Sequence, residues 1–78
     1  MKIKRMMRVS DSELEVLKLL WLNNKEISKN LCIEVVTVKS HIHNLLIKLK
    51  AKTRTELLVK ALFYRIITLQ EVIEKCSE

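Results

Sequence analysis

Between Thr37 and His43 lies a run of side chains that can hydrogen-bond to another molecule but cannot readily catalyse a reaction. Lys39 can donate to a phosphate or to guanine O6 and N7, and the Ser40 hydroxyl can donate or accept. His41 and His43 are two residues apart, so on a helix they point to different faces and cannot share a metal ion. No Cys, Asp or Glu stands in a relay with them. We therefore expect a binding protein rather than an enzyme, with no metal and no cofactor.

Two helical patterns joined by a very short connection position this run. The first covers Asn24 to about Leu31, the second covers Val35 to about Lys50, and Cys32-Ile33-Glu34 lies between them. A stripe of apolar residues at i, i+4, i+7 and i+11 marks the core-facing side of the second pattern: Val38, Ile42, Leu45 and Leu49. Two short helices with a tight joint are typical of a helix-turn-helix, whose second helix lies in the major groove of DNA.

Capping signals mark four helix starts, each with a cap residue three positions before a glutamate. They are Ser10–Glu13, Asn23–Glu26, Thr53–Glu56 and Thr68–Glu71. These signals and the apolar spacing predict a first helix from Asp11 to about Leu22 and a fourth from Arg54 to about Arg65. They also allow a short helix from Leu69 to about Cys76.

The composition favours an all-α fold. The 78 residues contain neither Gly nor Pro, so sheet turns and glycine-rich phosphate loops are disfavoured. We expect Trp21 and Cys32 to be buried. Without glycine, we expect Asn23 or Asn24 to adopt the left-handed backbone between the first two helices, and Lys50 either accepts that conformation or the third helix ends by another route.

Charge is distributed unevenly along the chain, whose formal net charge is +6. Residues 1–65 hold fourteen of the fifteen basic residues and six of the nine acidic ones, whereas residues 66–78 hold Lys75 and three glutamates. A basic body attracts polyanions, of which nucleic acid is the commonest. A solvated surface that only keeps the protein soluble is the alternative on charge alone.

One domain fits this length, and we divide the chain into a flexible basic arm (1–8), a helix-turn-helix domain (9–67) and a helical tail (68–78). The start of the chain lacks the apolar segment of a signal peptide, and no stretch approaches the roughly 20 apolar residues of a membrane span. Cys32 and Cys76 form no metal-ligand spacing. We expect a cytoplasmic protein that does not enter a membrane.

A family resemblance rests on the order and spacing of several motifs. They are Val9-Ser10-x-x-Glu13-x-Glu15-Val16-Leu17, Asn24-Lys25-Glu26-Ile27-Ser28, Leu31-x-Ile33, Thr37-Val38-Lys39-x-His41, Asn44, Lys48-Leu49 and Arg54-Thr55-Glu56. This order closely resembles the LuxR/GerE-type helix-turn-helix domain, a four-helix module of bacterial transcription regulators. The similarity covers about residues 9–67, and it implies that fold and sequence-specific binding of double-stranded DNA.

The resemblance also implies a role for each matched position. Base contacts are expected from the outer face of the third helix, at Val36, Lys39, Ser40 and His43. Phosphate contacts are expected at helix starts and ends, at Asn24, Lys25, Thr37, Lys48 and Arg54. In the family the fourth helix commonly forms a homodimer interface, which here would involve Leu58, Ala61, Leu62 and Arg65.

Three positions depart from the family's pattern. The connection between the first and second helices is about two residues shorter and lacks a glycine, Lys50 stands where glycine is usual, and Glu34 replaces the usual Ser cap. A glutamate caps poorly, although its charge suits the positive end of the helix dipole.

These departures keep a second interpretation open, in which the domain binds another regulator rather than DNA. Val36 could pack on a thymine methyl, or Val35 or Val36 could close over the core. With Ile47, such apolar residues could instead form a surface that binds a protein. RNA polymerase or another regulator stays open as a protein partner beside DNA. Nonspecific RNA binding has little support, because the chain offers no aromatic platform.

Overall fold

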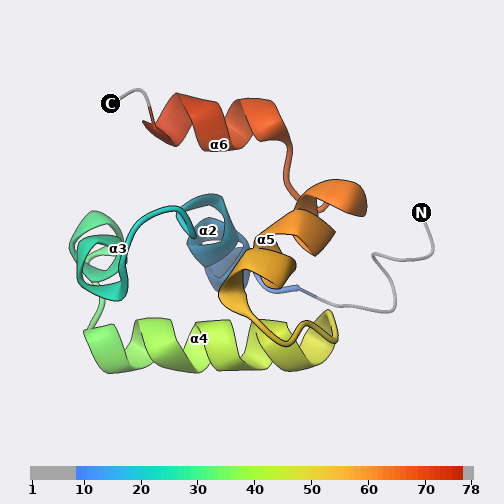
Figure 1. Cartoon of the computed structure of the whole chain (residues 1–78). Coiled ribbons are helices and arrows are strands. Elements are labelled where there is room, and N and C mark those ends of the chain that lie inside the picture. Colours follow the sequence, from blue (N-terminus) through green and yellow to red (C-terminus); the bar gives the residue numbers. More distant parts are fainter. Residues whose placement is uncertain (1–8, 77–78) are drawn as a thin grey trace.

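The computed structural model describes residues 9–76, which form helices and no strand. The helices are α2 (Asp11–Lys18), α3 (Asn24–Leu31), α4 (Val35–Lys48), α5 (Arg54–Phe63) and α6 (Leu69–Cys76) (Figure 1). The all-α prediction is confirmed, and the short C-terminal helix that the pattern allowed is present. The basic arm expected over residues 1–8 lies outside the described residues.

Local capping chemistry starts the helices where the sequence places them. In α2, α3 and α6 the cap side chain accepts from the backbone N–H of the glutamate three residues on, and that glutamate accepts in return from the N–H of the cap residue. At α5 only the first half forms, because Glu56 accepts from the Lys52 N–H instead of the Thr53 N–H. Three of the four predicted capping boxes are therefore complete.

The first helix is shorter than predicted, because α2 ends at Lys18 rather than Leu22. Beyond it the backbone tightens into successive turns, in which Leu19, Leu20 and Leu22 each donate to the carbonyl three residues back. Tightening the last turn in this way carries the chain from α2 to α3 without a glycine. The ends of α4 and α5 fall two residues before the predicted ones, which is ordinary fraying.

Left-handed backbone occurs at three helix ends within residues 9–76, at Cys32 (φ 56°), Lys50 (φ 55°) and Arg65 (φ 60°). The prediction that Asn23 or Asn24 would adopt it was wrong, since Asn23 is extended (φ −79°) and caps α3, and Asn24 is the first residue of that helix. In each case the next residue donates its N–H to the carbonyl five residues back, at 2.9–3.1 Å. This pattern satisfies the last carbonyls of the helix, and it ordinarily uses glycine.

The core is almost entirely aliphatic and lies on one side of α4. The predicted α4 stripe is buried throughout, and it meets side chains from the other elements: Val16, Leu17, Ile27, Leu57 and Ile67. Helices α2, α3 and α5 all lie on the same side of α4 (Figure 1). Two predictions of burial were wrong, because Trp21 is 39% exposed and Cys32 is exposed at the turn between α3 and α4.

Candidate nucleic-acid interface

The outer face of α4 is open to solvent because every helix that packs on α4 lies on its other side (Figure 1). The exposed residues of this face, which we call the α4 face, are Val36, Lys39, Ser40, His43, Asn44 and Ile47. All four predicted base-contacting residues are among them. An exposed helix of fourteen residues with such a polar row has the dimensions to enter a major groove.

The two histidines of α4, and the neighbouring residues Val35 and Val36, differ in exposure as the helical spacing suggested. His43 is exposed on the α4 face, while His41 is half-buried and lines a small cavity of about 170 Å³ with Ser12, Glu15, Leu31 and Ile33. Val35 is half-buried and Val36 is 68% exposed. Val36 is therefore the valine available to a partner. Within residues 9–76 no cluster of His, Cys, Asp or Glu has the size to hold a metal ion.

The N-termini of α3 and α4 carry the predicted phosphate-binding residues other than Lys48 and Arg54. Lys25 is exposed, whereas Asn24 and Thr37 are half-buried. Glu34 precedes α4 in an extended conformation, and its side chain makes no capping hydrogen bond to any described residue. The first N–H groups of α4 thus keep the orientation that favours an anion, although Glu34 adds a negative charge beside them.

Arg54, the first residue of α5, holds the connection between α2 and α3 through hydrogen bonds. Its guanidinium donates to the carbonyls of Leu20 (3.3 Å) and Leu22 (2.6 Å) and to Asn24 Oδ1. Burial lowers the pKa of this guanidinium, but arginine stays charged at neutral pH. The contacts of Arg54 and Asn24 with phosphate remain predictions, whereas the bracing role was missed. The feature that could have indicated this role is the short connection after the first helix, whose backbone carbonyls have no partner within a helix.

Lys48 ties the end of α4 to the start of α2. Its Nζ donates to Glu13 Oε1 at 2.7 Å, and the same carboxylate accepts from the Ser10 N–H at 3.0 Å. Burial raises the pKa of the Glu13 carboxyl, but the hydrogen bonds from Lys48 and Ser10 and the charge of Lys48 outweigh it, so the pKa lies below its usual value. The sequence pattern predicted only the capping role of Glu13, because a contact across 35 residues has no local signature.

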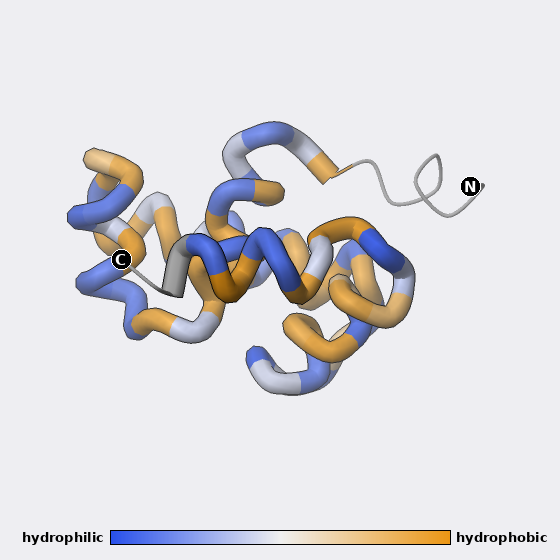
Figure 2. Tube along the Cα trace, turned by 90° about the horizontal axis from the view of Figure 1, so that it is seen from above, coloured by the Kyte–Doolittle hydropathy of each residue, from blue (hydrophilic) through white to orange (hydrophobic). Residues whose placement is uncertain are grey.

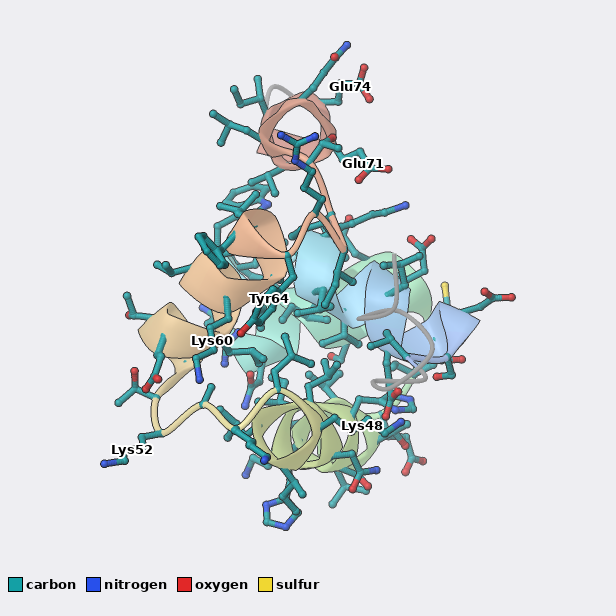
Figure 3. The ribbon with its side chains drawn as sticks, turned by 90° about the vertical axis from the view of Figure 1, so that its right-hand side faces the viewer. Lys48, Lys52, Lys60, Tyr64, Glu71 and Glu74 are labelled. Carbon is teal, nitrogen blue, oxygen red and sulfur yellow. The ribbon has the colours of Figure 1, made fainter. Side chains whose placement is uncertain are left out.

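The acidic residues of α6 lie at the opposite end of the molecule from α4. Figure 3 shows Lys48 and Lys52 on the side of α4, with Glu71 and Glu74 on α6 at the other end. The carboxylates of α6 are therefore remote from the α4 face. This separation lets the α4 face attract a polyanion without repulsion from the acidic tail.

Comparison with known families assigns the domain. Residues 7–61 match the family model described as "Bacterial regulatory proteins, luxR family", and this segment is more than half of the chain. The chain belongs to the LuxR family. Neither a curated protein nor a solved structure matched it. The predicted family and its helix-turn-helix fold are thus confirmed, and α3 and α4 are the two helices of that motif.

The predicted dimer residues of this LuxR-family chain lie at different depths on α5 and, in the case of Arg65, just after it. Leu58 and Leu62 are half-buried and Arg65 is exposed, whereas Ala61 is fully buried and packs in the core. Ala61 therefore has no surface to offer a second chain, which corrects its predicted place in an interface. Two further apolar residues of the same helix, Val59 and Phe63, are exposed and were not among the predicted interface residues. None of the helices in the described part is long and apolar enough to span a membrane.

Proposed function

We propose that this LuxR-family chain is a transcription regulator that binds double-stranded DNA sequence-specifically, as a homodimer, with α4 in the major groove. The observation that carries the proposal is the α4 face, on which Lys39, Ser40 and His43 are exposed directly opposite the buried stripe. The protein acts by binding, without catalysis and without a cofactor.

Each exposed residue of the α4 face has a chemical role in this proposal. Lys39 donates to guanine O6 and N7 or to a neighbouring phosphate, and Val36 packs on a thymine methyl group. Ser40 and His43 lie on the same exposed side and hydrogen-bond to base edges. Lys25 and Thr37 approach the phosphates from the first turns of α3 and α4, and Lys48 and Arg54 add contacts from the ends of α4 and α5.

Selection of binding sites from sheared genomic DNA, followed by electrophoretic shift at about 0.1 M salt, tests the groove assignment. Lys39→Ala should weaken binding of the selected site by about 10- to 100-fold, as expected for one good base contact. Lys29→Ala is the matched control, because Lys29 is an exposed lysine near the C-terminal end of α3. If Lys39→Ala binds as tightly as the control, α4 does not read DNA in this way.

A second function is favoured by the apolar residues of the α4 face, where Val36 is 68% and Ile47 is 62% exposed. In this alternative the α4 face binds another regulator protein. Capture of partners from a cell extract with and without nuclease separates the two functions. Recovery that survives nuclease and is lost in Val36→Asp supports protein binding, whereas recovery that nuclease abolishes supports DNA binding.

A further inference from the structure

Two exposed lysines lie in the short segment between α4 and α5, which covers residues 49–53 and which we call the α4–α5 turn. They are Lys50 and Lys52. Within residues 9–76 neither ammonium group forms an ion pair, whereas those of Lys48 and Lys60 are each paired with a glutamate. The α4–α5 turn therefore presents two positive charges that are available to a partner.

Lys50 stands at the position where the LuxR/GerE pattern usually has glycine. Its backbone is left-handed (φ 55°), a conformation that glycine adopts without the steric cost that a lysine meets. The fold uses only the backbone of this residue, whose N–H donates to the Ile47 carbonyl at 3.2 Å and whose carbonyl accepts from Lys60. The charged side chain of Lys50 thus adds nothing to the fold among the described residues, and we looked for its role in binding.

Polar contacts from α5 fix the backbone of the α4–α5 turn. The Lys60 Nζ donates to the carbonyls of Leu49 (3.2 Å) and Lys50 (2.7 Å). The Lys52 N–H donates to Glu56 Oε1 at 2.9 Å, and the other oxygen of this carboxylate lies 3.3 Å from Lys60 Nζ. One glutamate and one lysine of α5 therefore hold the backbone at both exposed lysines of the turn.

The same contacts balance the negative charge beside the turn. Carbonyls at the C-terminal end of a helix carry a partial negative charge, which the Lys60 ammonium offsets. Hydrogen bonds from the Lys52 N–H and from Lys60 hold the pKa of the Glu56 carboxyl below its usual value, and Lys60 also pairs with the resulting charge. An anion that approaches the turn thus meets Lys50 and Lys52 without an unbalanced carboxylate beside them.

Lys52 lies beside α4, on the side opposite Lys48. Figure 3 looks along α4 and shows Lys48 on one side of the helix and Lys52 on the other, with the Lys52 side chain directed away from the domain. A helix with its side chains is about 10–12 Å across and a major groove is about 12 Å wide, so the two phosphate backbones run along the sides of a helix that fills the groove. Lys52 therefore lies where one of these backbones would pass.

Helix α6, which carries the acidic residues of the C-terminal segment, lies away from this region. Figure 2, viewed from above, shows α6 in front of the other helices, and Figure 1 shows α4 on the opposite side of the domain. The carboxylates of α6 therefore do not oppose an anion at the α4–α5 turn.

We propose that Lys50 and Lys52 bind backbone phosphates of the DNA strand on one side of the groove that α4 enters. Such contacts fix the position of α4 in the groove but carry no sequence information, because phosphates are the same at every base pair. The inference rests on the proposed function, since these phosphates come within reach only when α4 lies in the groove. It adds two positions to the predicted phosphate contacts, and it gives the lysine that replaces glycine a role.

The salt dependence of DNA binding tests the proposal. Lys52→Gln and Lys50→Gly each remove one phosphate contact, so the plot of log association constant against log salt concentration should become shallower by about 0.9. At about 0.1 M salt each variant should bind about eightfold more weakly, and by the same factor for the selected site and for a scrambled duplex. Lys39→Ala should instead weaken the selected site more than the scrambled one.

Two controls keep this result specific to the turn. Lys29→Ala lowers the net charge by one as well, at an exposed lysine of α3, and should leave the slope unchanged. Glycine suits the left-handed backbone at position 50, so Lys50→Gly should keep its fold, which circular dichroism checks. An equal loss of slope in Lys29→Ala would show that net charge alone is responsible and would overturn the contact.

Methylphosphonate substitution locates the phosphate that Lys52 binds. A neutral methylphosphonate replaces one phosphate at a time on both strands of the selected site. At the phosphate bound by Lys52 it should weaken the wild type about eightfold and leave Lys52→Gln unchanged, because the two changes remove the same interaction. A set of sensitive phosphates that is identical for the two proteins would overturn the proposal.

Dependence on Lys39 separates a failure of this inference from a failure of the proposed function. If binding depends on Lys39 but the slopes of Lys50→Gly and Lys52→Gln equal that of the wild type, α4 reads DNA and the α4–α5 turn does not touch it. If no duplex is bound at all, the proposed function is wrong and this inference is wrong with it.

Discussion

Helices α4 and α6 are both amphipathic, yet the rest of the domain holds them in different ways. Helix α4 buries one complete apolar stripe against α2, α3 and α5, and it turns a polar face to solvent. Helix α6 packs chiefly on α2, and it keeps Leu69 and Ile73 on the outside. Polar contacts at the end of α4 are short, as between Lys48 and Glu13 at 2.7 Å, whereas Lys18 and Glu71 at α6 are 3.6 Å apart.

This difference suits the two helices to two kinds of binding, one through fixed polar groups and one through apolar surface. A DNA-reading helix must present its donors in a fixed geometry, and fixing that geometry in the free protein lowers the entropy cost of binding. Helix α4 meets this need through the contact between Lys48 and Glu13 and through its packing against α2, α3 and α5. Arg54 fixes the connection between α2 and α3. Helix α6 instead offers exposed apolar surface, whose burial stabilises only when another surface covers it.

Replacing Arg54 by lysine tests whether the connection between α2 and α3 is held by hydrogen bonds or by charge. Lysine keeps the charge but cannot reach the two carbonyls and Asn24 Oδ1 at once. The free energy of unfolding should fall by about 2–3 kcal/mol in urea denaturation. Arg65→Lys, at an exposed arginine, is the control and should change it by less than about 0.5 kcal/mol. Equal stabilities of the two variants would contradict the bracing role.

Glu13→Gln tests the anchor between α2 and α4, and it should cost about 1–2 kcal/mol at neutral pH. The pKa of Glu13 is lowered in the folded protein, so its contribution to stability is present above the usual value of 4.5 and is lost as the pH falls through the folded pKa. The difference between wild type and variant should therefore shrink below pH 4.5. A difference that is independent of pH would show that the carboxylate charge does not stabilise the fold.

Lys50→Gly tests the strain at the end of α4 and should stabilise the protein by about 0.5–1 kcal/mol. Lys50 is left-handed, which glycine adopts without a steric cost, although glycine also loses more entropy on folding. Thermal unfolding measures the change. Lys52→Gly, outside left-handed backbone, is the control and should not stabilise. Equal gains in both variants would mean that the left-handed conformation carries no strain.

Glu71→Gln tests the ion pair that joins α6 to α2. Of these substitutions it should change the free energy of unfolding least. The carboxylate lies 3.6 Å from Lys18 Nζ and is substantially exposed, so the free energy of unfolding should change by no more than about 0.5 kcal/mol. Chemical denaturation of the two proteins side by side measures this. A loss as large as that of Glu13→Gln would show that α6 is held by its ion pair rather than by apolar packing.

Local rules in the sequence determined most of the fold. Capping residues such as Ser10 and Asn23 act within four positions, so the helix starts were predictable, and the α4 stripe follows from helical spacing alone. The outward placement of Lys39 and His43 follows from the same spacing. The family motifs also lie in the sequence, and the match to the family model confirmed the family that they indicated.

Several features could not be predicted, because they depend on contacts between distant segments. The sequence alone does not show that Trp21 would lie at the surface, that Cys32 would take the left-handed turn in place of Asn23, or that Ala61 would have no exposed surface. Exposure is decided by which helices pack on each side, and not by residue type.

By itself, then, the sequence determined the helices, the family and the row of residues that α4 turns outward, because caps and periodicity act over a few residues. Only the tertiary structure decided that Glu13 receives Lys48, that Arg54 closes a connection without glycine, and that α6 leaves apolar residues uncovered. The physical reason is that hydrogen bonds and burial across 30 or more residues exist only once the chain has folded, so no local pattern encodes them.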